Sequence, residues 1–408
     1  MLDLQGYQLY GRQMILNGFG LPGQLKLQQS AVAVVGAGGL GCPALQYLAA
    51  AGIGRIAIID HDIVELSNLQ RQILHSERTI GWNKAKSAAQ ALSMQYPRLQ
   101  IDAHEFAVNA NNALELLRPY DIVLDCTDNA PTRYLLSDAS VLLDKPLVSG
   151  AAQKFDGQLC VYNLGPTGPC YRCLFPKPPA SALTASCEES GILGVVTGII
   201  GNLQALETIK ILTGLHDMKP SLVLFSALNL PFFRTVKLRS RKSNCVACRE
   251  PKISKLFKDT DYIQSCGGDK PDWELLGLQP GNSRNRLSAK ERALIYDKSS
   301  AYGISQGFAH ILLSSKPKKL IDVRPEVEFG ICQIPGFTNI PLDVLVANPQ
   351  GFLPGDPGTE IYIVCKLGND SQIAAEAMRS IRKQAVIQDI IGGLKAWARD
   401  VDNNFPIY

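Results

Sequence analysis

The sequence predicts an α/β protein: a doubly wound parallel sheet followed by a second, smaller α/β domain. An apolar run at 31–35 is followed by a glycine-rich turn, a helical segment and a second apolar run at 55–59, which is the order of a parallel strand-helix-strand unit. The same alternation returns after Arg286, with apolar runs at 320–324 and 361–364. A chain of 408 residues is also too long for one ordinary core, so we expect two or three domains.

The composition is that of a folded globular protein. Hydrophobic residues make up 46% of the chain and the formal net charge is +4, which excludes disordered and collagen-like classes and gives no reason to expect DNA binding. Polar residues such as Gln204 and Glu207 interrupt the most apolar stretch, 194–212, so we expect a packed helix and no membrane span. The opening Met1-Leu2-Asp3 has no signal core, which favours a cytoplasmic location with reduced thiols.

The first domain is expected to span residues 1–249 and the second residues 284–408. Residues 250–283 are rich in Lys, Asp, Gly, Pro and Gln with weak periodicity, which predicts a linker with one short ordered turn. In the first domain we expect helices at 7–17, 42–51, 84–96, 131–145 and 195–212, and strands at 31–35, 55–59, 122–125, 147–149, 158–162, 221–226 and 232–237. In the second we expect strands at 320–324 and 361–364 and helices at 371–382 and 393–399.

The glycine-rich turn and the acid after the second strand indicate a nucleotide site. Gly36, Gly38, Gly39 and Gly41 allow the backbone to approach a phosphate, and the helix that follows presents its amino terminus to that anion. Asp60 ends the second strand, where a carboxylate can hold ribose hydroxyls. A glycine turn by itself also fits an NAD-dependent dehydrogenase, so the rest of the chain must decide.

Polar residues further along favour a triphosphate over a dinucleotide. The segment Ser67-Asn68-Leu69-Gln70-Arg71, together with Lys84, supplies the amide and cationic groups that phosphates need. Cys126-Thr127-Asp128-Asn129 follows a buried strand, and ligands bind at the carboxyl ends of strands in open α/β sheets. These groups fit a triphosphate and Mg²⁺ better than a nicotinamide, which disfavours the dehydrogenase.

The cysteines indicate a structural metal site. The chain has eleven cysteines, an odd number, and two pairs are spaced as C-x-x-C: Cys170 with Cys173, and Cys245 with Cys248. In a reduced compartment, two such pairs match tetrahedral four-thiolate zinc, in which no position is left open for water. Unrelated reduced cysteines are the alternative.

Two weaker features receive plain interpretations. The histidines show no spacing typical of a ligand cluster and are assigned no role. The basic run at 234–242 alternates with period two, so we interpret it as a solvated strand face rather than a tRNA site.

Together these motifs resemble the enzymes that adenylate a small sulfur-carrier protein, a branch of the ubiquitin-activating enzymes that includes bacterial molybdopterin-synthase adenylyltransferase. The resemblance rests on the glycine turn, Asp60, the 67–71 segment, Lys84, the 126–129 segment and both cysteine pairs. With the second domain, the whole chain resembles the eukaryotic two-domain adenylyltransferase and sulfurtransferase that activates the ubiquitin-related modifier. It implies a Rossmann-like adenylating domain with structural zinc, followed by a rhodanese-like domain.

The resemblance also implies roles in an ATP site. Arg12, Asn68, Arg71 and Lys84 would bring the carrier carboxylate to the α-phosphate of ATP and stabilise pyrophosphate. Asp128 would hold Mg²⁺, with capping of the next helix as its other possible role. In the family, the counterpart of Arg12 reaches the neighbouring subunit's nucleotide, which implies a homodimer. An exposed helix arginine is the alternative.

Cys187 lies in a polar stretch, 185–189, without a pairing partner. In the family this loop carries the cysteine that takes the carrier as a thioester or an acyl disulfide. The flanking Glu188 and Glu189 disfavour a thiolate, because thiolates are favoured beside positive charge. An inert loop thiol is therefore the alternative.

The second domain resembles rhodanese. Asp322-Val323-Arg324 and Ile334-Pro335-Gly336-Phe337 match the first half of that domain, and the segment from Cys365 to Ser371 takes the place of its active loop. A cysteine between a buried strand and a helix receives backbone N–H groups and the positive end of the helix dipole, which stabilise a thiolate or persulfide. Lys366 occupies the position where rhodaneses commonly have arginine. The positive charge is kept, but the planar, two-point binding of an anion by a guanidinium is lost. An inactive rhodanese-like scaffold is the alternative.

The implied cycle is adenylation of a ubiquitin-like sulfur carrier, capture through Cys187, attack by persulfide on Cys365, and release of a thiocarboxylate. The resemblance implies that a cysteine desulfurase or another rhodanese donates the sulfur. It also implies that the sulfur is used for tRNA wobble-uridine thiolation or molybdopterin synthesis. The alternative from a different class is a scaffold that activates or presents a modifier without transferring sulfur.

Overall fold

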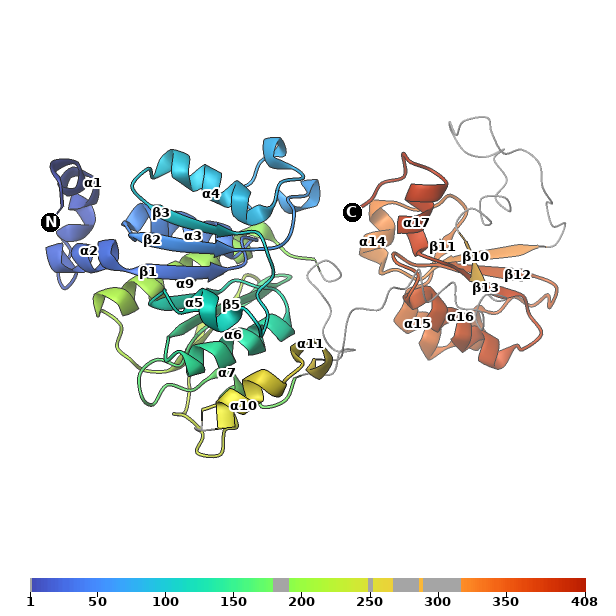
Figure 1. Ribbon diagram of the computed structural model, residues 1–408. Coiled ribbons are helices and arrows are strands. Elements are labelled where there is room, and N and C mark those ends of the chain that lie inside the picture. Colours follow the sequence, from blue (N-terminus) through green and yellow to red (C-terminus); the bar gives the residue numbers. More distant parts are fainter. Residues whose placement is uncertain (1, 179–190, 249–251, 267–285, 289–316) are drawn as a thin grey trace. The chain divides into compact units, whose positions relative to one another are not determined.

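The computed structural model of the chain describes residues 2–178, 191–248, 252–266, 286–288 and 317–408 (Figure 1). The chain divides into two compact units, Met1–Asp269 and Lys270–Tyr408. Each unit has its own sheet and its own hydrophobic cores, so each is described by itself.

The first unit alternates strands and helices in the order that the sequence predicts. Its elements are α1 (Leu4–Met14), α2 (Gly20–Gln29), β1 (Ala31–Val35), α3 (Gly41–Ala51), β2 (Arg55–Ile59), η1 (Leu66–Asn68), η2 (Glu77–Thr79), α4 (Lys84–Gln95), β3 (Gln100–His104), α5 (Ala113–Leu117), β4 (Ile122–Asp125), α6 (Ala130–Leu142), β5 (Leu147–Gln153), β6 (Asp156–Tyr162), α7 (Tyr171–Leu174), α9 (Gly194–Thr213), β7 (Ser221–Ser226), β8 (Phe233–Lys237), α10 (Lys252–Asp259) and α11 (Tyr262–Ser265).

The sheet of the first unit has eight strands in the order β3-β2-β1-β4-β5-β6-β7-β8. The strands from β3 to β5 are parallel, and β6, β7 and β8 continue the sheet in antiparallel fashion. The chain passes from β1 to β2 on one side and later returns to β4 on the other side. The carboxyl end of β1 is therefore a topological switch point, which is where open α/β sheets bind ligands.

Helices cover both faces of this sheet (Figure 1). Val32 and Val34 of β1 pack in one core with α3 and α9, whereas Ala33 and Val35 pack in the other core with α5 and α6. A parallel strand buried on both faces must be apolar at every position. This explains why β1, β2 and β4 are recognisable in the sequence as continuous apolar runs.

Helix α9 is, by length and composition, the one helix in the described ranges that could cross a membrane. It packs instead against α2, α3, β5 and β6, and Gln204 is completely buried. The Gln204 side chain donates to the carbonyls of Asp125 (2.8 Å) and Val148 (3.1 Å), at the ends of two strands. Gln204, one of the polar residues that interrupt this helix, therefore fastens it to the sheet.

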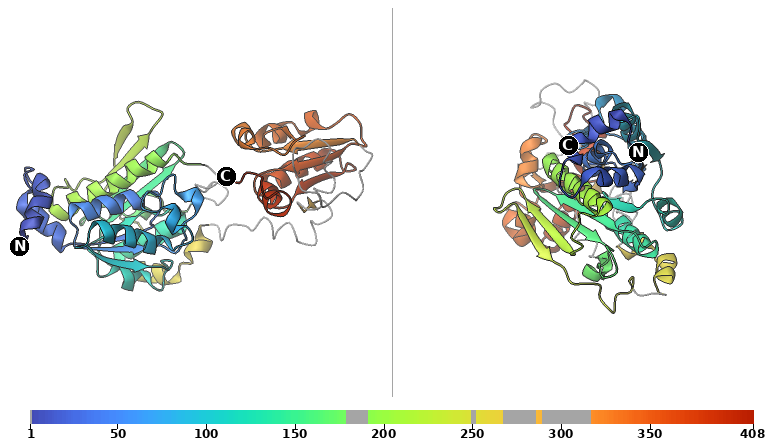
Figure 2. Two further views of the ribbon diagram at one scale, coloured as in Figure 1. Left: turned by 90° about the horizontal axis from the view of Figure 1, so that it is seen from above. Right: turned by 90° about the vertical axis from the view of Figure 1, so that its left-hand side faces the viewer.

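The strands β7 and β8 form a hairpin that extends from the edge of the sheet (Figure 2). Every residue of β8 is exposed, as the solvated-face interpretation of the basic run predicts. Arg241 differs from that prediction. Its guanidinium is half-buried and donates to the carbonyl of Gly168 (2.8 Å) and to Oδ1 of Asn163 (2.6 Å), so it holds the chain ahead of the second cysteine pair.

The predicted linker at 250–283 contains ordered helices that belong to the first unit. Helices α10 and α11 both pack against α6. Ile253, Phe257 and Tyr262 are buried there, and the hydroxyl of Tyr262 donates to Asp138 (2.9 Å). The first unit thus extends beyond residue 249, because Ile253 and Phe257 of α10 and Tyr262 of α11 complete its core.

The second unit is a smaller, fully parallel α/β unit. Its elements are β9 (Arg286–Leu287), β10 (Lys318–Asp322), α14 (Glu326–Ile331), β11 (Thr338–Asn339), α15 (Leu342–Ala347), η6 (Pro349–Phe352), β12 (Glu360–Val364), α16 (Asp370–Ile381), β13 (Ile387–Ile390) and α17 (Gly393–Asp400). The strand order is β11-β10-β12-β13-β9. Ile321 and Ile363 face one core and Val364 and Ile390 face another, so this sheet too is covered on both sides.

Candidate active sites and metal centre

The glycine turn lies at the switch point and is shaped by close backbone contacts. Gly36 has φ +97°, and a Cβ there would lie 2.6 Å from the carbonyl oxygen of Cys126. A Cβ on Gly41, the first residue of α3, would lie 1.9 Å from the carbonyl oxygen of Gly36. Because side chains fit at neither position, the turn closes tightly against the loop after β4 and directs the amino terminus of α3 into the space above β1.

One peptide of this turn, that of Ala37, is fixed on both sides. Its N–H donates to Asp60 (2.7 Å), and its carbonyl accepts from His75 Nε2 (2.9 Å) and from the Cys42 thiol (3.3 Å). Ser87 contacts the other ring nitrogen of His75 (2.9 Å). Since a carbonyl can only accept, His75 carries its proton on Nε2. No sequence pattern indicated this role of His75, because its partners lie far away along the chain.

Asp60 ends β2 and is 9% exposed. Its second oxygen accepts from the backbone N–H of Asp62 (2.9 Å). Burial raises the pKa of Asp60, while the N–H groups of Ala37 and Asp62 partly oppose that effect. The carboxylate thus supports the glycine turn from the end of the neighbouring strand.

The predicted phosphate-binding residues are held by partners in their own chain. Lys84 is buried, and its ammonium donates to Asp62 (2.9 Å), an exposed residue that the sequence did not single out. Asn68 is buried and caps the short helix η1, and Arg71 donates to the carbonyl of Ser67 (3.0 Å). The backbone of Gln70 contacts Gly194, where α9 begins. The 67–71 segment is therefore folded against the start of α9.

In the loop after β4, Asp128 is free for cation binding, because a different residue caps the next helix. Asn129 caps α6 by accepting from the N–H of Thr132 (2.9 Å). Asp128 is exposed and makes no hydrogen bond or ion pair to any residue that the structure describes. Its carboxylate is therefore available for a cation, and oxygen ligands of this kind suit Mg²⁺.

A buried ion pair beneath this loop fixes its shape. Asp125 accepts from Arg133 Nε (2.9 Å) and from the hydroxyls of Ser149 (2.7 Å) and Thr127 (2.6 Å). Arg133 also donates to the carbonyls of Thr127 and Gly150 (3.0 Å each). The hydrogen bonds of Arg133, whose side chain is 12% exposed, thus position the Thr127-Asp128 backbone.

Arg12 lies at the other end of the sheet from the glycine turn. It is an exposed residue in the last turn of α1 and has no partner among the described residues. The neighbouring Gln13 donates to the carbonyl of Ala51 (2.8 Å), which is the last residue of α3. Helix α3 has 11 residues and is thus roughly 16 Å long. Its other end, at Gly41, adjoins the glycine turn, so that length separates α1 from the turn of the same chain.

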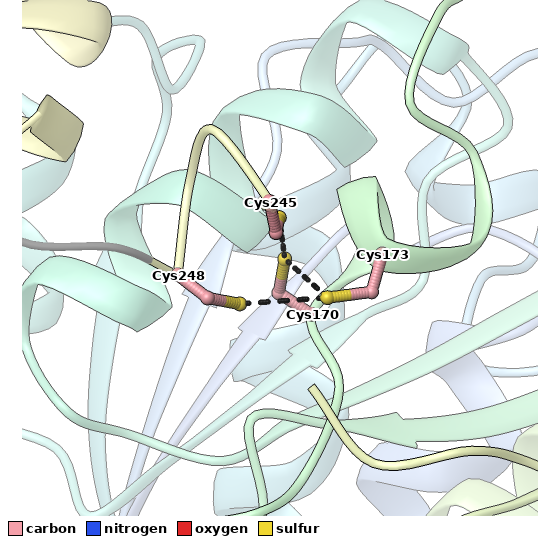
Figure 3. A group of neighbouring side chains, drawn as sticks. All are labelled: Cys170, Cys173, Cys245 and Cys248. Atoms are coloured by element: carbon pink, nitrogen blue, oxygen red, sulfur yellow. Dashed lines mark hydrogen bonds between the residues drawn. The ribbon is translucent and has the colours of Figure 1, made fainter. Parts of the chain in front are cut away.

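Four cysteines form a compact cluster (Figure 3). Cys170 and Cys173 come from the start of α7, and Cys245 and Cys248 come from the loop ahead of α10. The Sγ atoms are 3.8 Å apart within the first pair, and 3.6 Å separates Cys170 from Cys245 and Cys173 from Cys248. Four thiolates around one zinc ion would be roughly 3.8 Å apart. The cluster can therefore hold a metal ion with little rearrangement.

The first cysteine pair is anchored to α6. Arg172, between the two cysteines, is buried and binds both oxygens of Asp138 at 2.8 to 3.0 Å. Tyr262 of α11 donates to the same carboxylate. The metal cluster, α6 and α11 thus form one packed region, which explains why the helices in the predicted linker are part of this unit.

Cys187 and the 185–189 stretch lie outside the described residues. Cys365 is described and is fully buried at the end of β12. Its Sγ accepts from the N–H of Gly368 (3.1 Å) and contacts the hydroxyl of Ser371 (3.4 Å), as expected for a loop that leads into α16. Burial nevertheless raises the pKa of Cys365, and the hydrogen bonds from Ser371 and Gly368 only partly oppose it.

The Cys365 loop is supported from two other elements. The N–H groups of Leu394 and Lys395, at the start of α17, donate to the carbonyls of Cys365 (2.9 Å) and Lys366 (3.1 Å). Arg286 of β9 donates to the carbonyl of Gly368 (3.1 Å). A cavity of about 500 Å³ lies beside the amino terminus of α16, between the loops that follow β10 and β11. The loop is therefore rigid and borders a space that a substrate can enter.

The comparisons with known proteins match each unit to a known domain family. Residues 10–247 match the ThiF family, and residues 309–400 match the rhodanese-like domain. The chain is 46% identical over 404 residues to "Adenylyltransferase and sulfurtransferase MOCS3" of Drosophila yakuba, and the match covers 98% of this chain and 84% of that protein. The chain belongs to the MOCS3 family.

Other MOCS3 proteins match over similar lengths. The one from Culex quinquefasciatus is 43% identical over 409 residues, covering 98% of this chain and 89% of that protein. A crystal structure of E. coli MccB with ATP aligns with 56% of this chain and 69% of that chain, at a TM-score of 0.48 and 22% identity. As a MOCS3 family member, the protein is an adenylyltransferase and sulfurtransferase, which confirms the resemblance and the α/β fold class predicted from the sequence.

Proposed function

We propose that this enzyme adenylates the C-terminal glycine of a ubiquitin-like sulfur-carrier protein with MgATP and converts it to a thiocarboxylate. The observation that carries the proposal is the set of groups at the carboxyl ends of β1, β2 and β4. A rigid glycine turn, the Asp60 carboxylate and the Asp128 carboxylate, which has no partner among the described residues, follow three adjacent strands, and the Lys84 ammonium at the start of α4 binds Asp62 beside them. This set is suited to a ribose, a triphosphate and a divalent cation.

In this proposal each group meets one part of ATP. Asp60 accepts from a ribose hydroxyl, and the turn from Gly36 to Gly41, with Gly38 and Gly39, lies against the phosphates. Lys84 exchanges its exposed partner Asp62 for phosphate oxygens, while Arg71 and Asn68 act on the same anion. Mg²⁺ on Asp128 would neutralise charge as pyrophosphate leaves.

Arg12 would complete the site of a second subunit. It is about the length of α3 away from its own glycine turn, and it has no described partner. A two-fold dimer would bring the exposed α1 of one subunit to the carrier and triphosphate of the other. The proposed active form is therefore a homodimer.

The proposed metal of the cysteine cluster is zinc with a structural role. Thiolates suit zinc, and four of them leave no coordination position for water or substrate. Hydrogen bonds within the cluster lower the pKa of Cys173 and Cys245 and raise that of Cys170 and Cys248, so a bound cation would be needed to hold all four as thiolates. When bound, zinc would join α7 to the chain ahead of α10.

Sulfur transfer would use two cysteines in sequence. Cys187 displaces AMP and forms a thioester with the carrier, and the persulfide on Cys365 then attacks that carbonyl and releases the Cys187 thiolate. This gives a carrier–S–S–Cys365 acyl disulfide. Attack of Cys187 on the Cys365 sulfur frees the thiocarboxylate and leaves a Cys187–Cys365 disulfide, which an external thiol must reduce. A cysteine desulfurase or another rhodanese would reload Cys365.

The proposed destination of the sulfur is the wobble uridine of tRNA, with molybdopterin synthesis as a further use, in the cytoplasm. Both destinations follow from the family resemblance. No residue in the described part of the chain favours one of these destinations over the other.

The first half of the proposal is tested by ATP–pyrophosphate exchange with the purified protein and a ubiquitin-like carrier that ends in glycine. Exchange should require the carrier's terminal carboxylate, and Lys84→Met should reduce it by at least about 100-fold because a charged phosphate contact is lost. Lys219→Met is the matched control and should leave exchange unchanged, because the Lys219 side chain is 76% exposed and follows the end of α9 that is remote from Gly194. Exchange that persists in Lys84→Met would contradict the assignment of the ATP site.

A further inference from the structure

The chain that follows α17 returns to the Cys365 loop. Phe405 is buried in the core of the second unit, and the thiol of Cys332 contacts the carbonyl of Pro406 (3.7 Å). These contacts bring Tyr408 to Lys366, whose ammonium nitrogen lies 4.3 Å from the centre of the Tyr408 ring. Lys366 directly follows Cys365 and is the cation of the loop from 365 to 370.

The Tyr408 ring is held rigidly. Its hydroxyl accepts from Arg324 Nη1 (2.6 Å) and donates to Glu328 (2.8 Å). Arg324 is itself almost completely buried, and its remaining N–H groups donate to Asp322 and to the carbonyls of Glu328 and Cys332. A ring fixed in this way presents one face at a defined place.

A lysine ammonium over a tyrosine ring is attracted by the negative face of the ring. Lys366 is half-exposed, so its other potential partners are water and any anion that enters the site. An anionic sulfur donor that uses Lys366 must therefore first replace its contact with Tyr408. A donor that brings sulfur as a cysteine persulfide on a protein surface does not depend on this lysine to the same degree.

We infer that Tyr408 is a specificity-determining residue of the sulfur-transfer site: by holding Lys366 on its ring, it disfavours small anionic sulfur donors. The inference rests on the proposed role of Cys365 as the residue that carries sulfur. Thiosulfate is a small donor of this kind, and its reaction with Cys365 and cyanide is balanced without a further reagent. The Cys365 thiolate attacks the outer sulfur of thiosulfate, the S–S bond breaks, sulfite leaves, and cyanide then removes the outer sulfur as thiocyanate and regenerates the thiolate.

The test measures thiocyanate formation from thiosulfate and cyanide by the full-length protein. Replacing the ring with an aliphatic side chain in Tyr408→Leu should lower KM for thiosulfate by about 2- to 5-fold, which is the range expected for one exposed cation–π contact. Tyr408→Trp should raise KM, since indole binds cations best. Tyr408→Phe keeps the ring but loses both hydroxyl contacts, so its KM should stay closer to that of the unmodified protein, whatever its stability.

A double-variant cycle separates specificity from structural support. In a Lys366→Gln background, Tyr408→Leu should no longer change KM, because the contact that it removes is already absent. The inference is overturned if Tyr408→Leu changes KM for thiosulfate equally in both backgrounds. It is also overturned if Tyr408→Leu and Tyr408→Trp shift KM in the same direction, or if no variant forms thiocyanate. The variant Cys365→Ala distinguishes a failure of the proposed role of Cys365 from a failure of the inference about Tyr408. Thiocyanate formation that survives Cys365→Ala overturns the proposed role of Cys365, whereas its loss together with a flat Tyr408 series overturns only the inference about Tyr408.

Discussion

Asp128 and Asn129 are adjacent in sequence, yet their side chains have different surroundings. Asn129 satisfies a free N–H at the start of α6, whereas Asp128 is exposed and unpartnered among the described residues. Asp125 and Arg133 hold the backbone between these positions from below. Stability and catalysis should therefore respond to different members of this pair.

We expect Asn129→Ala to lower the free energy of unfolding by about 1 kcal/mol, since it removes a helix cap. Asp128→Ala should leave stability nearly unchanged and reduce carrier adenylation by at least about 100-fold, because it removes the proposed Mg²⁺ ligand. Urea unfolding and ATP–pyrophosphate exchange measure the two effects. Equal loss of exchange in both variants would indicate that Asp128 acts through the loop and not through the cation.

His75 makes the glycine turn sensitive to acid. Burial lowers its pKa below the usual 6.5, so the folded protein favours the neutral ring that donates to Ala37. The unfolded chain binds a proton at higher pH than the folded chain does. The stabilisation is therefore complete above about pH 6.5 and is lost as the pH falls through the lowered folded-state pKa.

We expect amide exchange in residues 31–42 to accelerate as the pH is lowered from 7 to 5, after correction for intrinsic exchange rates. In His75→Gln, which keeps a donor but does not titrate, this pH dependence should be flattened. His61→Gln is the control, because the His61 side chain is 63% exposed. Hydrogen exchange with mass spectrometry measures both. An unchanged pH dependence in His75→Gln would contradict the role assigned to His75.

At the scale of elements, the cysteine cluster joins α7, the chain ahead of α10, and α6. The cluster packs with Ile253, and Asp138 of α6 receives hydrogen bonds from Arg172 and Tyr262. Removing one ligand should thus affect more than the cluster itself. Structural zinc sites contribute on the order of 10 kcal/mol to the folding of small domains.

Cys170→Ser should lose bound zinc and lower the unfolding temperature of the first unit. Elemental analysis of the purified protein and a thermal scan measure these two effects together. Cys266→Ser is the control, because Cys266 lies outside the cluster and should leave metal content unchanged. A folded, zinc-free Cys170→Ser protein with an unchanged melting temperature would show that the metal is not structural.

The sequence predicts elements whose residues share one environment and misses those that depend on distant partners. Apart from Arg55 and Asp125 at their ends, strands β1, β2 and β4 are apolar, because both of their faces are buried. Strands β3 and β13 were not predicted. The first of these is only partly buried, and the second contains Asp389, whose charge is matched by the distant Arg286. Helix α10 was assigned to a linker for the same reason, since its buried Phe257 is recognisable only once α6 is in place.

The candidate sites follow the same rule. Asp60, Lys84 and the cysteine pairs belong to motifs with local spacing, so the sequence identifies them. Their supports in the structure, such as His75 and Arg133, are single residues whose partners are brought together only by the fold. Such residues carry no local pattern that would separate them from ordinary core or surface positions.

At the scale of the whole molecule, the proposed homodimer rests on the position of Arg12. Helix α1 contacts the end of α3 that is remote from the glycine turn, so a direct role for Arg12 in its own site would require a large displacement of α1. A dimer provides the contact without such a change. Each active site would then combine Lys84 from one subunit with Arg12 from the other.

Arg12→Ala and Lys84→Ala should each abolish most adenylation, but mixed dimers of the two variants should regain activity. A mixed dimer contains one site that lacks both residues and one intact site, so about half of the activity per dimer should return. Co-expression with two affinity tags isolates the mixed dimers for the exchange assay. If Arg12 served its own subunit, both sites of the mixed dimer would lack one residue and activity would stay low.

The most direct test of the central claim is the intact mass of the carrier after one reaction with the full-length enzyme, MgATP, a persulfide donor and a thiol reductant. The account predicts the mass increase for replacing one oxygen of the terminal carboxylate by sulfur, in the unmodified enzyme and not in Cys365→Ala. Cys365→Ala should still release pyrophosphate in the presence of the carrier. A carrier that is adenylated but never gains sulfur would contradict the account and identify the protein as an activating scaffold.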